Sequence, residues 1–554
     1  MKLLYYILIP ILLLTSACED FEEINTSPNN PEEVSSNFIL TYVLSETAKL
    51  YESQGRYDYN ISGAMQYTQR GTEFNSTGPN FYGWDNESWS GYYNVLRNNQ
   101  IIYDNAVEEN NPSFQGVALV MKSLVFGLLT DLYGDIPYSQ SLEASNDVFF
   151  PSYDDQKSVY IGILNDLREA DQILSDSQTA DYPINASSDI YYGGNVDQWR
   201  KFANSLRMRY AMRLYNKKSE VSEIDLASEF QSASAHTFES NDDNAVMEYV
   251  GTTEDNSAPG GSLRSANPNF SVKASLTLIE TLRNINDPRL ERWVSPALKK
   301  WDSNVNTIRD TVVTNIYGEQ YTVTLMPPDG EGLDTSIYVG LPIGLPSIEA
   351  INYNIGEDEE FFDPEKNPHI SFLHDRYRLN KEELVDVKLI TYSEVNFLLA
   401  EAVLKGDMGI SGDAETYYRE GIEASMEDWK VFRDAIGFNF DNYYASENVD
   451  LSLAEDKLER VMEQKWIAGW LQPESWFDWR RTGFPELETG EITQFGDAIP
   501  IRYIYPTPNL DPNYLVNYES AIEKLEATGF VPVGQSKDHH YSRMWLLQGT
   551  GKPW

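Results

Sequence analysis

Cysteine, histidine and positive charge are all scarce in this chain. Its 554 residues include one cysteine, five histidines, and 42 lysines and arginines against 86 aspartates and glutamates. One cysteine cannot form a disulfide within the chain, so stability must come from a core, and a chain of this length can bury a large one. The formal net charge of −44 repels phosphate backbones, so nucleic acid is not an expected partner.

Familiar catalytic and cofactor motifs are also missing. The sequence contains no G-x-S-x-G, H-E-x-x-H, C-x-x-C or G-x-G-x-x-G string and no P-loop. Asp302, Asn304 and Asn306 begin like a calcium loop, but Thr307 stands where that loop requires glycine. We therefore expect no enzyme activity, no cofactor and no metal site.

The one cysteine, Cys18, ends an N-terminal export signal. Lys2 precedes an apolar run from Leu3 to Leu14, and small residues lead from there to Cys18. This run is too short to span a bilayer, and no later stretch is expected to do so. The layout resembles a bacterial lipoprotein signal, in which the cysteine is acylated. We expect a signal peptide over 1–17, a lipidated flexible tether over 18–36 and a single ligand-binding domain over 37–554.

Apolar residues recur mainly at helical spacing, which predicts a mainly α fold. Such patterns predict helices over 117–132, 199–213, 392–403, 414–425 and about 455–470. The stretch 391–426 reads as a helical hairpin of tetratricopeptide type, and a similar unit is expected over about 156–215. Residues 311–325 alternate around a Tyr-Gly-Glu turn, which predicts a β-hairpin among long loop insertions.

An aromatic loop is the strongest binding signal in the sequence. Phe81, Tyr82 and Trp84 lie among amide and acidic side chains that include Asn86. Ring faces pack on the C–H faces of sugars, while amides and carboxylates hydrogen-bond to sugar hydroxyls. The alternative is that these rings attach the loop to the helical body. For Trp89 and the tyrosines that follow it, we favour the core.

Several strings together resemble the SusD/RagB family of nutrient-binding outer-membrane lipoproteins. They occur in family order over nearly the whole chain: Thr130–Tyr138, Pro151–Leu167, Trp199–Arg209, Asn286–Arg289, Tyr392–Ala402, Trp476–Gly483 and Ile499–Pro506.

This resemblance implies a fold, partners and a location. The fold would be a SusD-like α-α superhelix of tetratricopeptide-like hairpins carrying a loop-rich ligand face. The protein would be lipid-anchored in the outer membrane and exposed at the cell surface. There it would bind oligosaccharides, or in some members peptides, and deliver them to a TonB-dependent SusC-like barrel without cutting them.

The resemblance also implies roles for single residues. Phe81, Tyr82 and Trp84 occupy the loop that carries ligand-stacking rings in starch-binding members, and Trp301 and Tyr338 lie in a second contact segment. Arg480, Arg481 and Arg502 would pair with buried acids.

Three other functions remain open at this point. The same scaffold could bind peptides, or it could be a purely structural surface protein. It could also be a glycan-cleaving enzyme, since Asp85 and Glu87 are one of many possible carboxylate pairs.

Overall fold

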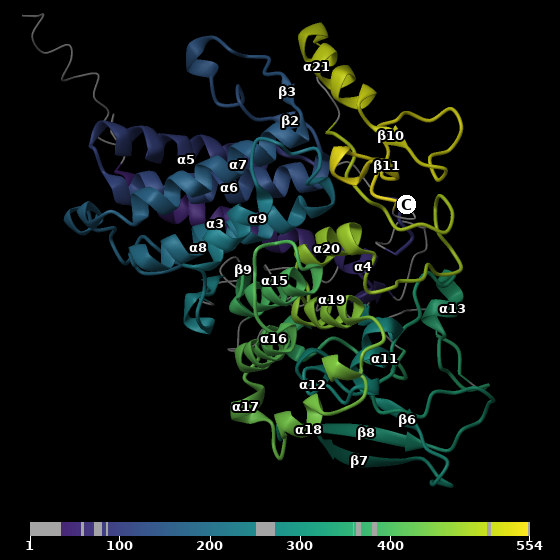
Figure 1. The fold of residues 1–554 in the computed structure, drawn as a ribbon. Helices are drawn as coiled ribbons and strands as arrows, with labels where there is room; N and C mark the ends of the chain where they lie inside the picture. Colours follow the sequence, from purple (N-terminus) through teal and green to yellow (C-terminus); the bar gives the residue numbers. More distant parts are fainter. Residues whose placement is uncertain are drawn as a thin grey trace, which may run out of the picture.

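The computed structural model describes residues 35–56, 60–70, 80–84, 87–250, 272–357, 359–361, 367–378, 385–506 and 511–551. The fold is mainly α with short strands, as the sequence predicts. Cys18 and the expected signal peptide lie outside the described residues, as does nearly all of the tether. The long helices gather on one side of the molecule, and most of the long loops gather on the other (Figure 1).

The first group of helices packs in sequence order. Each of α5 to α8 contacts the next helix in the chain, ending with α9, and α3 lies against α5 and α6 (Figure 1). The pair α7 and α8 forms the second hairpin predicted over about 156–215. The bounds are α3 Ser36–Gly55, α5 Ser90–Glu108, α6 Pro112–Tyr133, α7 Gln156–Leu174, α8 Val196–Arg213 and α9 Leu226–Ser234.

Helix α6 is the centre of this group, and local sequence sets both of its ends. The Asn111 side chain accepts a hydrogen bond from the Phe114 amide at 3.1 Å, and Pro112 occupies the first turn. Gly134 ends the helix with φ +97°. We expected no later stretch to be long enough and apolar enough to span a membrane. That expectation is wrong, because α6 meets both the length and the hydropathy criteria. However, 94% of its apolar window is buried inside the protein, as in the core helix of a soluble fold.

A second group of helices follows in the chain and contacts the first through α8 and α15. Gly421 on α16 shows how closely these helices approach, since an added Cβ would lie 3.0 Å from the Phe397 ring on α15. Small residues therefore stand where helices meet, as expected for the predicted hairpin over 391–426. The bounds are α15 Tyr392–Lys405, α16 Ala414–Asp428, α17 Val431–Asp434, α18 Phe440–Tyr444, α19 Lys457–Ala468 and α20 Glu474–Thr482.

The remaining elements are mostly short, and most of them lie on the loop-rich side. Their helices are α4 Asn60–Ala64, α11 Leu276–Asn284, α12 Leu290–Trp293, α13 Ser347–Ile351, α14 Asp375–Arg378 and α21 Pro512–Glu523. Their strands are β1 Thr68–Arg70, β2 Ile136–Pro137, β3 Tyr153–Asp154, β4 Ala245–Met247, β5 Val272–Ala274, β6 Lys299–Trp301, β7 Arg309–Thr314, β8 Gln320–Met326, β9 Val387–Ile390, β10 Glu526–Ala527 and β11 Ser542–Arg543.

The predicted β-hairpin is confirmed and belongs to the only three-stranded sheet among the described residues. Its strands β7 and β8 pair antiparallel, with Thr314 opposite Gln320 next to the turn. Strand β6 adds to β8 in parallel, with Trp301 opposite Met326. The other four sheets of the described part have two strands each. The pairs β1–β5 and β4–β9 connect segments that are distant in sequence, whereas β2–β3 and β10–β11 pair neighbouring strands.

Buried ion pairs connect the two helical groups. Arg209 on α8 binds Glu394 on α15 at 2.7 Å, and Arg213 pairs with Glu474 on α20. Arg481 pairs with Glu401 and Asp478, while Arg502 binds Asp538 at 2.7 Å. Arg480 Nη2 lies 3.8 Å from the Asp131 carboxylate. The acid partners implied for Arg480, Arg481 and Arg502 are therefore present. Pairing with an opposite charge offsets the cost of burying these side chains.

Candidate functional site

The aromatic loop packs onto the body of the protein. Tyr82 is fully buried, and Trp84 is only 6% exposed. Ring centroids of Trp84 lie 5.6 Å from Trp476, 5.4 Å from Tyr503 and 5.7 Å from His540. Trp84 and Tyr82 thus offer no free ring face in this conformation. Their ligand role remains a prediction.

Two other predicted site residues, Trp301 and Tyr338, are also buried. Trp301 is fully buried, stacks on His369 at 4.6 Å and donates from Nε1 to the Asn354 carbonyl at 2.8 Å. Tyr338 is 6% exposed and lies in the main core cluster, whereas Trp301 does not. The one ring of the set that keeps a half-exposed position is Phe81. Asn86 lies outside the described residues.

Two open clefts lie beside each other on the loop-rich side, and we call them the loop-face clefts. The first has a volume of about 520 Å³ and the second about 410 Å³. Both are lined by Glu488, Thr489 and Gly490, so this short segment separates them. The first cleft is completed by Trp479, Leu487, Asp497, Ala498, Ile499 and Phe530. The second is completed by Gln66, Leu276, Thr277, Glu280, Thr281, Asn284, Pro342, Ile343 and Glu486.

Close backbone contacts hold this dividing segment in place. A Cβ at Gly490 would lie 1.9 Å from the Ile343 carbonyl oxygen, so only glycine permits the approach. The Ile492 amide donates to the Gly344 carbonyl at 2.8 Å. Gln66 Nε2 donates to the Glu488 carbonyl, and Gln66 Oε1 accepts from the Thr277 hydroxyl at 2.6 Å. The clefts are therefore built before any ligand arrives.

The aromatic loop is joined to the first cleft through the same region. The Gln494 amide donates to the Phe81 carbonyl at 2.8 Å. His540 Nε2 lies 2.8 Å from the Trp84 carbonyl, and its Nδ1 lies 2.9 Å from that of Arg502. The loop that the sequence singles out is thus a structural neighbour of the cleft.

The chemistry of the lining suits a neutral polar ligand. Hydroxyls, amides and carboxylates stand beside a half-exposed ring at Phe530. Every charged side chain that lines the two clefts is acidic, namely Glu280, Glu486, Glu488 and Asp497. Such a surface accepts hydrogen bonds from sugar hydroxyls and repels anionic polymers.

Sequence reasoning missed the segment over 486–498. It lies between the Trp476–Gly483 and Ile499–Pro506 strings and belongs to neither. The available signal was its composition, because this stretch combines glycine, threonine and acidic residues shortly after the Trp476–Gly483 string. That signal indicates a loop but does not show which side of the fold the loop faces.

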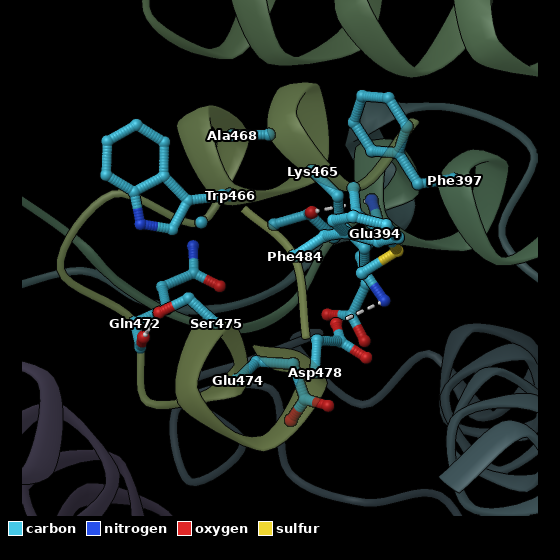
Figure 2. A pocket seen from close by; sticks show the side chains of 13 residues that line it. Glu394, Phe397, Lys465, Trp466, Ala468, Gln472, Glu474, Ser475, Asp478 and Phe484 are labelled. Atoms are coloured by element: carbon cyan, nitrogen blue, oxygen red, sulfur yellow. Dashed lines mark hydrogen bonds and ion pairs between the residues drawn. The ribbon is translucent and has the colours of Figure 1, made fainter. Parts of the chain in front are cut away.

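A third and much smaller pocket, shown in Figure 2, has Glu394, Lys465, Glu474 and Asp478 in its lining. Lys465 and Asp478 point toward each other across it, and their ion pair measures 2.6 Å. Burial raises the pKa of the Asp478 carboxyl, but Lys465 and Arg481 outweigh it and hold the net value well below its usual range. The cavity volume of about 20 Å³ has room for one or two water molecules. This pocket is part of the ion network that joins the helices.

In the part of the chain that the structure describes, no group of three or more histidine, cysteine or acidic side chains could hold a metal ion. The adjacent pair His539 and His540 instead packs among aromatic rings, with His539 4.8 Å from Phe495 and 5.5 Å from Tyr541.

We call His539, His540, Phe495 and Tyr541 the His539 cluster. We expect the burial of His539 in this cluster to make the free energy of unfolding depend on pH. Burial, followed by His540 and Arg502, lowers the pKa of His539 to about 4, against about 6.5 in an unfolded chain. The unfolded chain then binds a proton below pH 6.5 that the folded protein does not take up until about pH 4. Stability should fall as pH drops through this window.

Urea unfolding at several pH values measures this effect in wild type and His539→Gln. Between pH 6.5 and 4, the free energy of unfolding of His539→Gln should fall less steeply than that of wild type. The matched control is His236→Gln, since His236 lies outside the His539 cluster. Equal slopes in wild type and His539→Gln would contradict the prediction.

Comparisons with known proteins are consistent with this architecture. The family described as "SusD-like_2: Starch-binding associating with outer membrane" matches residues 28–324 and 334–506. No curated protein matches the chain.

Among solved structures, a SusD homologue from Bacteroides fragilis is 27% identical, with a TM-score of 0.69 over 93% of this chain and 99% of its own. An outer membrane protein from Bacteroides vulgatus, whose description links it to nutrient binding, is 25% identical, with a TM-score of 0.71 over 93% of this chain and 100% of its own. A chitin-binding protein is 24% identical, with a TM-score of 0.68 over 92% of this chain and 98% of its own.

Proposed function

Because this chain belongs to the SusD-like family of starch-binding proteins that associate with the outer membrane, we propose that it captures oligosaccharides in the loop-face clefts. It then delivers them to a TonB-dependent, SusC-like barrel in the outer membrane. A lipid on Cys18 holds the protein at the cell surface. The observation that carries the proposal is the pair of preformed, acid-lined clefts around Glu488, Thr489 and Gly490.

A neutral glycan fits these clefts on physical grounds. Ligand sites combine apolar surface with a few placed polar groups, and here Phe530 supplies the ring while Glu488, Thr489 and Asp497 supply hydrogen-bonding groups. The chitin-binding protein with a similar fold makes chitooligosaccharides reasonable first ligands, beside the starch fragments that the family description names. The acidic lining argues against uronic acid polymers.

We expect Phe530→Ala to weaken binding of the recognised glycan about tenfold, because one stacking ring at a binding site contributes on the order of 1.4 kcal/mol. Calorimetry with maltooligosaccharides, chitooligosaccharides and polygalacturonate measures the affinities, and polygalacturonate should not bind. Phe432→Ala is the matched control, since Phe432 is 47% exposed on α17 and lines neither cleft.

Three results would contradict the proposal. Equal affinity of Phe530→Ala and wild type would remove the first cleft from the site. Binding of oligopeptides with no glycan binding would favour the peptide-binding alternative. New reducing ends after incubation with a bound glycan would show an enzyme. Co-purification of a TonB-dependent barrel from native membranes tests the delivery step separately.

A further inference from the structure

The two loop-face clefts share one wall. Glu488, Thr489 and Gly490 line both cavities, so a ligand that reaches this dividing segment from one cleft is already at the edge of the other. The wall is accessible to solvent, since Glu488 is exposed and Thr489 and Gly490 are half-exposed. A single ligand of sufficient length can therefore contact both clefts at the same time.

The end of the dividing segment at Gly490 is free of side chains. Gly490 packs there against Gly344, where an added Cβ would lie 2.9 Å from the Gly490 Cα. Gly344 also has φ +62°, a conformation that glycine adopts without strain. Two backbones therefore meet at this point with no side chain from either glycine between them. A chain ligand can lie across Gly490 without displacing a bulky group.

The dividing segment is also fixed in position from the side of the second cleft. The Gln66 side chain is 2% exposed, and it donates to the Glu488 carbonyl while accepting from the Thr277 hydroxyl at 2.6 Å. The Gln66 backbone is held in turn, because its carbonyl accepts from the Ser275 hydroxyl. The spacing between the two clefts is therefore set before a ligand binds, which lowers the ordering cost for a ligand that contacts both.

Each cleft by itself is large enough for a short oligosaccharide. The volumes of about 520 and 410 Å³ both lie within the roughly 300–1,000 Å³ of sites for drug-sized ligands. A di- or trisaccharide is a ligand of that size. Hydrogen-bonding groups are present on both sides, with Asp497 in the first cleft and Thr281 and Asn284 in the second. A longer oligosaccharide therefore exceeds one cleft and finds polar partners in the other.

We propose that the two loop-face clefts are two halves of one site, which a single oligosaccharide fills by crossing the dividing segment at Gly490. A shared site rests on the proposed glycan-binding function and adds to it the class of ligand, a linear chain long enough to occupy both clefts. Once one end of the chain is bound, the other end stays at high local concentration beside the second cleft. The combined affinity then exceeds that of either cleft by roughly 10²–10⁴.

A series of chain lengths tests the shared site. Calorimetry on wild type compares maltooligosaccharides up to the heptasaccharide and chitooligosaccharides up to the hexasaccharide. In the series that binds, the association constant should rise about a hundredfold or more from the disaccharide to the longest member. The longest member should bind as one chain per protein. A chain confined to one cleft should gain only severalfold, from the larger number of positions in which it can bind.

One variant fills the second cleft and leaves the first open. Thr281 on α11 is half-exposed and lines the second cleft but not the first, so Thr281→Trp places a ring in it. The longest chain should then bind about a hundredfold less tightly than to wild type, while the disaccharide keeps its affinity for the first cleft. Thr416→Trp is the matched control, since Thr416 is exposed on α16 and lines neither cleft. It should bind the whole series as wild type does.

A shared site is ruled out if affinity grows only severalfold with chain length, if two of the longest chains bind per protein, or if Thr281→Trp binds the longest chain as wild type does. The proposed function would survive each of these results, because a glycan would still bind. The first two measurements use wild type, so they decide the question even if Thr281→Trp does not fold. If no member of either series binds to wild type, the proposed function itself is contradicted and the shared site fails with it.

Discussion

Replacing Arg481 by methionine is expected to lower the free energy of unfolding by about 3–5 kcal/mol. Arg481 is buried and pairs with two buried carboxylates, Glu401 and Asp478. Removing the guanidinium leaves Glu401 with only the Lys405 ammonium at 3.4 Å. An uncompensated buried charge costs far more than a lost surface pair. Urea unfolding followed by circular dichroism measures the change.

A double variant makes this prediction sharper. Changing Arg481 and Glu401 together to methionine removes both charges, and Asp478 keeps Lys465 at 2.6 Å. The double variant should therefore be more stable than Arg481→Met alone. Lys49→Ala is the control, because its pair with Glu46 is exposed and should contribute less than about 1 kcal/mol. A loss below about 1 kcal/mol in Arg481→Met would contradict the assignment of a buried, coupled network.

The second large effect is expected at Trp84. Trp84→Ala should destabilise the protein by about 3–5 kcal/mol, because it leaves a large cavity beside Trp476, Tyr503 and His540. The aromatic loop then loses its attachment to the body. Thermal and urea unfolding measure the loss, and Phe530→Ala is the comparison, since its half-exposed ring should cost much less stability.

This experiment also decides between the two interpretations of the loop. If Trp84→Ala keeps the wild-type unfolding curve and loses only glycan binding, Trp84 contacts the ligand. The ring would then leave its packed position when the glycan binds. If stability falls as expected, the ring belongs to the core. Weaker glycan binding in Trp84→Ala would then follow from the loop's contact with the first cleft.

Much of the helical architecture could be predicted because an amphipathic helix requires apolar residues at a regular spacing within one short segment. The spacing of Val117, Val120, Met121 and Leu124, with Gly134 after them, is sufficient to place α6. The hairpin of α15 and α16 follows from the same spacing, and Gly421 marks the contact. The β-hairpin follows from alternation around one turn.

The candidate site could not be predicted in the same way, because a cleft is made by segments distant in sequence. Gln66, Thr277, Ile343 and Glu488 line one cavity, yet no spacing in the chain relates them. Likewise, a ring-rich loop has the same composition whether its rings face ligand or core. The sequence around Trp84 and Trp301 does not show whether either ring is exposed, and only the structure shows that both are buried.

By itself, the sequence determined the mainly α fold, the positions of the principal helices and the membership of the SusD-like family, and its lipoprotein signal remains a prediction. Those properties depend on periodicity, local composition and ordered strings of residues, all of which are visible in the sequence without knowledge of the fold. Only the tertiary structure decided which rings are buried, which carboxylates meet arginines and where open clefts remain. The physical reason is that burial and ion pairing depend on distances between remote residues, and those distances exist only after the chain has folded.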